Sequence, residues 1–551
     1  MALQDFRGQG PPSDIGTFQV PTGVMVFQHT FSGVTYICAV RSGERGWVLV
    51  DHRAVSAANN RIVLNTALAL GYEVFLAHGT YLLDASLVLA SNDRFEGESW
   101  STILSGAGNF DIISATGADA THLTNIFVGN LYIKGNGTGV ESGIHFYYVD
   151  YSRIDRVRVD DVGAAPPSGN DGIMLQVCLY CTVSHCYTYN CSNAGIDLVG
   201  DSATKYSGWN VVEGNTCRAN RCHGVQMWGE CRHNTIIGNT SKGNAEQGIQ
   251  IEGGTGNSGE AQFNTVTGNT CEGNLNRGID LLEGGSFNTI SSNSLQNNTL
   301  QGIRLSSGIY TEEGNVIIGN IIKDNGGATG SGIMIETSNV TWTIITGNYL
   351  ENNGNYGVDL YDGVHHVVEG NQIYNHGRCG IKSTDATYMS IQGNMIQTAS
   401  EAGIWLGRYT TPSSYSIIAG NKINACATGI MSGGSFDSIE DNNINACTAQ
   451  GIYITGGNSN YVGGNHIRAC TAYGIKVETS DDNVIVNNWT VGNGSGCVRI
   501  QDAACDRTRL WGNNFDEGAI SDAGTNTIAF DNFDSSAGAW IATIAPPAGG
   551  R

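Results

Sequence analysis

The amino-acid sequence predicts an all-β solenoid, and three features of its central part support this prediction. A Gly-Ile or Gly-Val pair recurs fourteen times between Gly143 and Gly474, at intervals of 22 to 30 residues. About half a period after each pair, an alternating run ends in Asn, as in "NVVEGN" to Asn215 and "NTIIGN" to Asn239. These short alternating runs are typical of strands, and no helical spacing is sustained. A repeat of this length indicates a solenoid.

The connections between the predicted strands are too short for a crossover helix, because they consist of a few Gly, Asn and Ser residues that suit tight turns. The simplest arrangement coils the chain so that each strand pairs in parallel with its equivalent one period later, about 4.8 Å away. The recurrent Asn then fits a ladder that points into the coil, where its amide binds the backbone and the next Asn. This arrangement is a parallel β-helix.

The segments "GNTCEGNLNRGIDL" and "NYLENNGNYGVDL" resemble the repeats of right-handed parallel β-helix proteins of the pectate-lyase-like superfamily. The resemblance covers roughly residues 45–515 and implies a right-handed solenoid of roughly 14 or more coils. The superfamily includes lyases, hydrolases, epimerases, phage tailspikes and non-catalytic surface proteins. The resemblance is therefore specific for the fold and leaves the chemistry open.

The segment before the repeats predicts a cap for the open end of the coil. Residues 56–71 ("SAANNRIVLNTALALG") place apolar side chains on one face of a short helix. With the strand and turns that follow, this resembles the N-terminal cap of phage-type and polysaccharide-lyase β-helices, which covers exposed strand edges. The predicted domains are residues 1–45, an adapter-like β segment; residues 46–515, the β-helix with its N-terminal helix cap; and residues 516–551, a short C-terminal segment.

The composition limits the partners and the compartment. The chain has 28 Lys and Arg against 50 Asp and Glu, a net charge of −22. This balance argues against nucleic acid, whose phosphates require a basic surface. It fits a neutral glycan, or an anionic glycan bound through Ca²⁺, the one cofactor that we consider. The N-terminus shows no signal peptide, and no apolar stretch is long enough to span a membrane. We expect an extracellular or virion-associated protein.

The 15 cysteines do not suggest a disulfide framework in a chain of this length. Three occupy the same place in consecutive repeats, which indicates stacked, buried thiols: Cys426, Cys447 and Cys470. Four lie close together in sequence, and the first two have the spacing of zinc ligands: Cys178, Cys181, Cys186 and Cys191. The alternative for these four is that they also point into the coil. We predict no metal ligand, and the zinc interpretation stays open.

The outward-facing positions of the repeat are candidates for a glycan-binding face. In Gly-Ile-x-Leu, the Ile and Leu point inward, so the residues two and four positions after the Gly point outward and form two columns. Aromatic rings in these columns can stack on sugars, and polar groups can bind hydroxyls. The predicted substrate-binding residues are Gln226, Trp228, Gln250, Tyr361, Lys382 and Trp405. The predicted catalytic residues are Glu252, Asp280, Arg304, Glu336 and Asp359.

Several chemistries remain open at these positions. Hydrolysis needs two carboxylates, about 5 Å apart for retention or about 6.5–9.5 Å apart for inversion. Glu252 with Asp280 is the preferred pair, and Glu336 with Asp359 is the second. Elimination or epimerisation of a uronate needs a base, and a positive group or Ca²⁺ that binds the uronate carboxylate. Arg304 and Lys382 are the candidates for the positive group. The competing interpretation is a solvated face whose opposite charges form ordinary ion pairs.

The predicted function is binding and degradation of a polysaccharide by a glycoside hydrolase or lyase of the tailspike or depolymerase type. The signature segments of polygalacturonase-type hydrolases and of pectate lyases are absent from the sequence. Two alternatives therefore remain: a non-catalytic adhesin or virion structural protein, and a secreted uronate lyase or epimerase. The expected partner is a polysaccharide, and assembly into a homotrimer is possible, because trimers are common among related β-helices.

Overall fold

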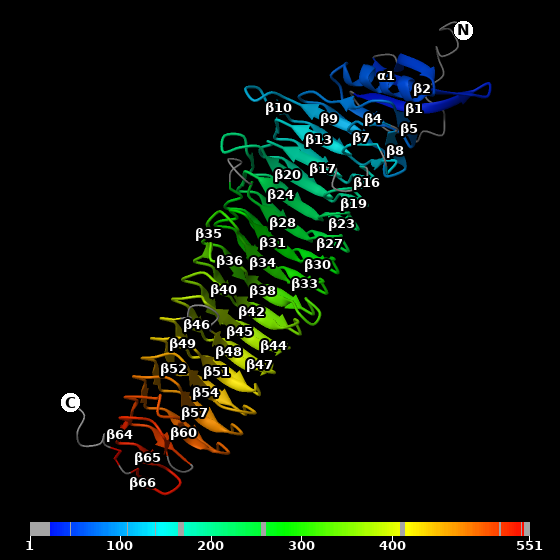
Figure 1. The fold of residues 1–551 in the computed structure, drawn as a ribbon. Helices are drawn as coiled ribbons and strands as arrows, with labels where there is room; N and C mark the ends of the chain where they lie inside the picture. The colour runs from blue at the N-terminus through cyan, green and yellow to red at the C-terminus, as the bar shows by residue number, and fades with distance from the viewer. Residues whose placement is uncertain are drawn as a thin grey trace. The chain divides into compact units, whose positions relative to one another are not determined.

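The computed structural model describes residues 23–43, 46–106, 108–137, 139–163, 170–254, 260–407, 414–516, 520–541 and 543–544. The chain divides into two compact units, Met1–Thr270 and Cys271–Arg551. In each unit, short strands follow one another in a fixed order, so that every coil adds one strand to each of three parallel sheets (Figure 1). Each unit is therefore a parallel β-helix, which confirms the predicted fold class. The three-domain division stays a prediction.

The first unit begins with an antiparallel meander and the predicted cap helix. Strands β1 (Val24–Phe31), β2 (Val34–Gly43) and β3 (Gly46–Ala54) pair in antiparallel order, and β1 also pairs in parallel with β4 (Val74–Leu76). Helix α1 (Ala57–Leu68) follows, and the hydroxyl of Ser56 accepts a hydrogen bond from the backbone N–H of Asn59, as an N-cap should. The helix was expected at this place. Residues 1–22 of the predicted adapter lie outside the described residues.

Three parallel sheets make up the rest of the first unit, and we number them in the order in which the chain visits them. The first sheet contains β4, β7 (Arg94–Gly97), β11 (Phe127–Gly129), β15 (Arg153–Asp155), β18 (Thr182–Ser184), β22 (Val211–Glu213), β26 (Thr235–Ile237) and β29 (Thr265–Thr267). The second contains β5 (Gly79–Leu83), β8 (Thr102–Gly106), β12 (Tyr132–Lys134), β16 (Arg158–Asp160), β19 (Tyr187–Tyr189), β23 (Thr216–Arg218) and β27 (Thr240–Lys242). The third contains β6 (Leu87–Val88), β9 (Ile113–Thr116), β13 (Ile144–Tyr147), β17 (Ile173–Gln176), β20 (Ile196–Gly200), β24 (Val225–Gly229) and β28 (Ile249–Glu252).

The second unit repeats this plan. Its first sheet contains β32 (Thr289–Ser291), β36 (Val316–Ile318), β40 (Ile344–Thr346), β43 (Val367–Glu369), β46 (Ser390–Gln392), β49 (Ile417–Ala419), β52 (Ser438–Glu440), β55 (Tyr461–Gly463), β58 (Val484–Val486), β61 (Arg509–Trp511) and β64 (Ile528–Phe530). Its second contains β33 (Ser294–Gln296), β37 (Ile321–Lys323), β41 (Tyr349–Glu351), β44 (Gln372–His376), β47 (Met395–Ala399), β50 (Lys422–Asn424), β53 (Asn443–Asn445), β56 (His466–Arg468), β59 (Trp489–Val491), β62 (Asn514–Phe515) and β65 (Phe533–Asp534). Its third contains β31 (Ile279–Leu282), β34 (Ile303–Ser306), β38 (Ser331–Ile335), β42 (Tyr356–Leu360), β45 (Cys379–Thr384), β48 (Ala402–Gly407), β51 (Thr428–Ser432), β54 (Ile452–Thr455), β57 (Tyr473–Glu478), β60 (Gly496–Ile500) and β63 (Ser521–Asp522).

A few short strands lie outside these three sheets. They are β10 (Leu123–Thr124), β14 (Val149–Asp150), β21 (Ser207–Gly208), β25 (Cys231–Arg232), β35 (Glu312–Glu313) and β39 (Val340–Thr341). Strand β30 (Thr270–Glu272) belongs to the second sheet, and β66 (Ala539–Trp540) pairs with β65 in antiparallel order at the end of that sheet. No helix in the described ranges is long and apolar enough to cross a membrane.

The recurrent glycine is required by the close approach of backbone and side chains at that position. A Cβ added at Gly403 would lie 2.5 Å from Cγ2 of Ile423 and 2.7 Å from the carbonyl oxygen of Gly429. Neither neighbour can move without disturbing a packed coil. The Ile that follows each glycine points inward and is buried, as at Ile404 and Ile430. The glycine therefore recurs once per coil because each coil has one such close contact at this position.

The predicted asparagine ladder is present in both units. In the second unit, the side-chain amide of Asn394 donates to the carbonyl of Val368 at 2.9 Å and to Oδ1 of Asn421 at 3.0 Å. Its own Oδ1 accepts the backbone N–H and the side-chain amide of Asn371, both at 3.0 Å. In the first unit, Asn215 binds Asn239 in the same way. Each ladder residue is buried and closes the turn of its own coil onto the next.

Candidate functional site

The third sheet carries the two outward columns in the predicted alignment. In the first unit, Asp197 pairs in register with Gln226, and Gln226 pairs with Gln250. In the second unit, Asp359 pairs with Lys382, and Lys382 pairs with Trp405. The columns therefore place these side chains one above the other on a single face of each unit.

A pocket of about 320 Å³ opens on this face in the first unit. It is lined by Asp171, Met174, Gln176, Asn193, Asp197, Val199, Gln226 and Trp228. Gln226 and Trp228 are among the residues predicted to bind substrate. Trp228 is 39% exposed beside the pocket and can offer its ring to a ligand.

Two buried aspartates in the pocket each have an oxygen without a hydrogen-bond partner among the described residues. Oδ1 of Asp171 accepts the backbone N–H of Ala194 at 2.8 Å and the amide of Asn193 at 3.0 Å, whereas Oδ2 has no partner. Oδ1 of Asp197 also has none. Because Oδ1 of Asp171 already accepts two hydrogen bonds, a proton on this carboxyl group belongs on Oδ2.

Burial keeps both carboxyl groups protonated to unusually high pH. It raises the pKa of Asp171 to about 7, although the hydrogen bonds from Ala194 and Asn193 oppose the shift. Burial also raises the pKa of Asp197 well above its usual range, and the charges of Asp171 and Glu252 add to this effect. A buried carboxyl group near other acids favours its neutral form. At neutral pH Asp197 is therefore a carboxylic acid that can donate a hydrogen bond, and Asp171 is close to the midpoint of its ionisation and can give up a proton.

A chain of amides connects the pocket to the predicted catalytic residue Glu252. The amide of Gln226 donates to Oε1 of Gln250 at 2.9 Å, and the amide of Gln250 donates to Oε2 of Glu252 at 2.9 Å. These bonds fix the orientation of both glutamines and hold the carboxyl group of Glu252 against the amide of Gln250. The structure thus brings Gln226, Gln250 and Glu252 together, as their alignment in columns predicts.

A second polar group lies beside the pocket on β13 and its neighbours. Nδ1 of His145 is 3.2 Å from Oδ2 of Asp111, and Nε2 is 3.2 Å from Oε1 of Gln176. Burial lowers the pKa of His145, but the hydrogen bond and charge of Asp111 outweigh burial, so the pKa lies above its usual value. The hydroxyl of Tyr147 is 3.2 Å from Oδ2 of Asp201, which also accepts the amide of Gln176 at 2.8 Å through Oδ1.

In the second unit the predicted catalytic residues form an ion-pair network. Nε and Nη2 of Arg304 donate to the two oxygens of Asp280 at 2.8 and 3.0 Å. Nη1 of the same arginine donates to Oε2 of Glu336 at 2.7 Å. Asp280 is completely buried, and Arg277 lies 3.4 Å from its Oδ2. Both carboxylates are therefore occupied by guanidinium groups.

A lysine surrounded by aromatic rings forms the second cluster of this unit. Nζ of Lys382 lies 3.3 Å from Oδ1 of Asp359. It is also 4.7 Å from the ring centre of Tyr356, 5.8 Å from that of Tyr361 and 6.0 Å from that of Trp405. The predicted residues Asp359, Tyr361, Lys382 and Trp405 therefore meet in one place.

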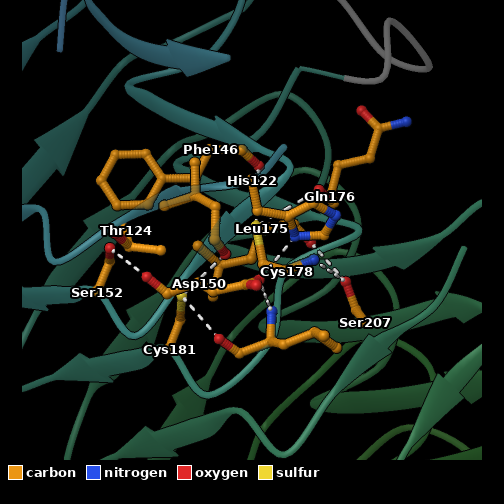
Figure 2. Close-up of polar contacts among 12 residues, drawn as sticks. His122, Thr124, Phe146, Asp150, Ser152, Leu175, Gln176, Cys178, Cys181 and Ser207 are labelled. Carbon is orange, nitrogen blue, oxygen red and sulfur yellow. Dashed lines mark hydrogen bonds and ion pairs between the residues drawn. The ribbon is translucent and has the colours of Figure 1, made fainter. Parts of the chain in front are cut away.

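The close-spaced cysteines of the first unit point into the coil. Sγ of Cys178 donates to the carbonyls of Phe146 at 3.3 Å and Gln176 at 3.4 Å, and Sγ of Cys181 donates to that of Val149 at 3.3 Å (Figure 2). Burial raises the pKa of Cys178 well above its usual value and that of Cys186 to about 12. These thiols remain protonated, whereas zinc and copper bind thiolates.

The sequence did not identify Asp171 as a site residue, nor Asn193 and Ala194, which donate hydrogen bonds to it. The two outward columns begin two positions after each Gly, and Asp171 precedes the Gly of the pair. The residue before the Gly also faces the pocket, so a third column read at that position would have found it. Asp197 belonged to the first column, but nothing in the sequence distinguishes it from a solvated aspartate.

The chain matches a family of known proteins over most of its length. The family model described as periplasmic copper-binding protein (NosD) matches residues 107–304, 301–438 and 431–537. No curated protein sequence matches the chain.

Several solved structures have a similar fold. The A-module of mannuronan C-5 epimerase AlgE4 from Azotobacter vinelandii has 18% identity and a TM-score of 0.45, with 58% of this chain and 91% of the epimerase chain covered. The Dettilon tailspike protein (gp208) has 17% identity and a TM-score of 0.43, with coverages of 61% and 62%. A mannuronic acid specific polysaccharide family 6 lyase from human gut microbiota has 15% identity and a TM-score of 0.45, with coverages of 66% and 85%. Similarity at this level concerns the fold alone.

Proposed function

Because the chain belongs to the family of the periplasmic copper-binding protein NosD and has a carboxyl-lined pocket on its third sheet, we propose that it is a polysaccharide-acting enzyme of the space outside the cytoplasm. The observation that supports this most strongly is the pair of protonated, buried aspartates beside an exposed tryptophan. Assembly as a homotrimer belongs to the same proposal and is checked by light scattering.

The donor groups of the described residues do not fit a copper site. Copper prefers thiolate, thioether and imidazole ligands. All 15 cysteines are buried, and no group of three or more His, Cys, Asp and Glu side chains within the described ranges is arranged to hold a metal. Three buried histidines, His223, His366 and His376, lie in different coils. No step of the proposed reaction therefore involves copper.

We expect the native cysteines to be inert and copper to leave the protein unchanged. A thiol reagent should label no cysteine until denaturant is added, because burial both blocks access and suppresses the thiolate. Adding Cu(I) or Cu(II), or removing either with a chelator, should not shift the melting temperature, since a ligand stabilises only the state that binds it. Rapid labelling of native protein, or a copper-dependent rise in melting temperature, would contradict this account.

The pocket has the parts that a sugar site requires. Trp228 offers a ring that can cover the apolar face of a sugar, and the amides of Asn193 and Gln226 offer polar contacts. Sugar hydroxyls both donate and accept hydrogen bonds, which suits a lining of neutral carboxyl groups and amides.

The proposed chemistry is general acid cleavage of a glycosidic bond. Asp171 is the acid: its proton on Oδ2 passes to the leaving glycosidic oxygen as the bond to the anomeric carbon breaks. Asp197 stays neutral and donates a hydrogen bond to the substrate, while a water molecule adds to the anomeric carbon and loses its proton to solvent. Glu252 lies three coils beyond Asp171, about 14 Å at the spacing of parallel strands, so it takes no part in breaking this bond. An acid whose pKa lies near the working pH is the most effective proton donor.

The polar group around His145 favours a second candidate, elimination or epimerisation of a uronate. Both ring nitrogens of His145 face oxygen atoms, which favours the charged imidazolium that a uronate carboxylate could meet. Hydrogen bonding to Tyr148, burial and the charge of Asp201 raise the pKa of Tyr147, so its hydroxyl stays protonated and can donate a hydrogen bond to a substrate.

The deciding experiment treats neutral and uronate polysaccharides with purified protein, with and without a chelator for Ca²⁺. New reducing ends without ultraviolet absorbance would identify a hydrolase. Absorbance from an unsaturated product would identify a lyase and move the chemistry to His145 and Tyr147. No turnover of any polymer by folded protein would refute the enzymatic proposal and leave the non-catalytic adhesin or virion structural protein.

The pH profile should report the ionisation of Asp171. Turnover by general acid catalysis needs its proton, so kcat/KM should fall above about pH 7, where the pKa lies. Stability should follow the same group: its folded pKa is above the unfolded value of 3.8, so the folded state binds more protons between about pH 4 and 7 and loses stability as the pH rises through this range. An Asp171→Asn variant should lack this loss when unfolding is measured at each pH. A flat kcat/KM profile up to pH 9 would exclude Asp171 as the acid.

A further inference from the structure

The carboxylates of the second unit's third sheet are engaged in ion pairs, which distinguishes this face from the pocket of the first unit. Asp280 and Glu336 both accept from Arg304, and Asp359 lies 3.3 Å from Nζ of Lys382. The oxygens of these carboxylates already meet fixed cationic groups, so they are less open to a substrate than the aspartates of the pocket. These residues are better suited to holding a surface in place than to acid–base chemistry.

The ring of Trp405 lies flat on its own strand. A Cβ added at Gly407, two residues further on, would be 3.0 Å from Cε2, 3.1 Å from Cζ2 and 3.3 Å from Nε1 of this ring. The indole therefore packs over the glycine, where any side chain would interfere. One ring face is turned to the backbone, and the other is turned away from the sheet.

Neighbouring side chains hold this ring and a second one in position. Lys382 lies between Tyr361 and Trp405, within 6.0 Å of both ring centres. Beneath them, Tyr356, Cys379 and Ala402 form a buried apolar cluster against which Trp405 packs. Tyr361 is 40% exposed, whereas Lys382 is almost buried. The result is a rigid surface with two aromatic rings and a fixed ammonium group between them.

We propose that Tyr361, Lys382 and Trp405 form a non-catalytic binding platform for pyranose polymers. Tyr361 follows β42 and Trp405 lies on β48, so the two strands are about 10 Å apart with Lys382 on the strand between them. Sugar C–H faces stack on the rings, and the ammonium group donates to hydroxyl or carboxylate oxygens. This inference rests on the proposed function, because it assigns the same polymer a second place of contact, on a different unit of the chain from the pocket.

The test measures binding without turnover, so that it is independent of whether the pocket is catalytic. Asp171→Asn protein migrates through native gels that contain alginate, pectate, xylan or dextran, and retardation gives the dissociation constant. The two uronate polymers and the two neutral polymers show which sugars the platform accepts. In this background, Tyr361→Ala with Trp405→Ala should weaken binding at least about tenfold, the equivalent of about 1.4 kcal/mol.

Two further variants separate ring geometry from a general loss of aromatic surface. Gly407→Ala keeps both rings but requires the ring of Trp405 to shift by a few tenths of an ångström, so it should weaken binding less than removal of the two rings. Tyr388→Ala with Tyr415→Ala removes two exposed rings that stack on each other at 5.2 Å elsewhere in the unit, and it should leave binding unchanged. Circular dichroism and melting curves confirm folding of each variant. Unchanged binding by the Tyr361/Trp405 variant, or no retardation of the parent protein by any polymer, would overturn the proposal.

Discussion

Replacing Asp171 with asparagine should reduce kcat by about 10²–10⁴-fold, the usual contribution of a general acid. The amide keeps an oxygen to accept the backbone N–H of Ala194 and the side-chain amide of Asn193, so the geometry of the pocket is preserved. It cannot transfer a proton to the leaving oxygen. Steady-state rates on the polymer found in the panel, measured at pH 6, provide the value.

The matched control is Asp161→Asn. Asp161 lies in a turn of the same unit with φ near 58°, a conformation that Asn adopts readily, and it accepts a hydrogen bond from Asn190. This variant should keep kcat within about twofold of the parent, because the amide introduced at this half-buried position keeps an oxygen that accepts from Asn190 and lies outside the pocket. Full activity of the Asp171→Asn protein would remove Asp171 from the mechanism. Equal losses in both variants would indicate a fault in folding.

Replacing Asn394 with alanine should destabilise the protein by about 3–5 kcal/mol. The change removes the partner of the backbone N–H of Asn371 and takes one hydrogen bond each from the side-chain amide of Asn371, the carbonyl of Val368 and Oδ1 of Asn421. Each buried polar group that loses its hydrogen bond costs about 1–3 kcal/mol. The measurement is urea unfolding followed by circular dichroism.

The control for this variant is Gln397→Ala, three residues further along the same coil. Gln397 is exposed, and its replacement should change the free energy of unfolding by under about 0.5 kcal/mol. A similar small effect of Asn394→Ala would mean that the ladder contributes to register but little to stability. Because coils of a solenoid interact mainly with their neighbours, unfolding curves with more than one transition are expected and are fitted accordingly.

The fold was predictable because its constraints repeat. One glycine per coil meets the backbone of the next coil, one asparagine per coil closes a turn, and the chain shows both at a nearly constant interval. Each coil contacts its neighbours in the same way, so a local pattern repeated many times specifies the architecture. The cap helix was predictable for a related reason, since Ser56 and the apolar face that follows it are local signals.

The candidate site was only partly predictable. Gln226, Trp228, Gln250 and Glu252 follow from the same periodicity, because the residues after the glycine alternate between the interior and the outer face. Asp171 does not follow from it, because its importance depends on burial and on the hydrogen bonds from Ala194 and Asn193 one coil away. Composition and spacing do not reveal that kind of environment.

The sequence by itself determined that this protein is a parallel β-helix, which side chains point outward and which of them share a column. Only the tertiary structure decided which outward carboxyl groups are protonated and which are held in ion pairs. Asp171 and Asp197 are buried at the pocket and form no ion pair among the described residues, whereas Asp280 meets Arg304 and Asp359 meets Lys382. The physical reason is that ionisation depends on desolvation and on charges brought close by neighbouring coils, and these distances are set by stacking, not by separation along the chain.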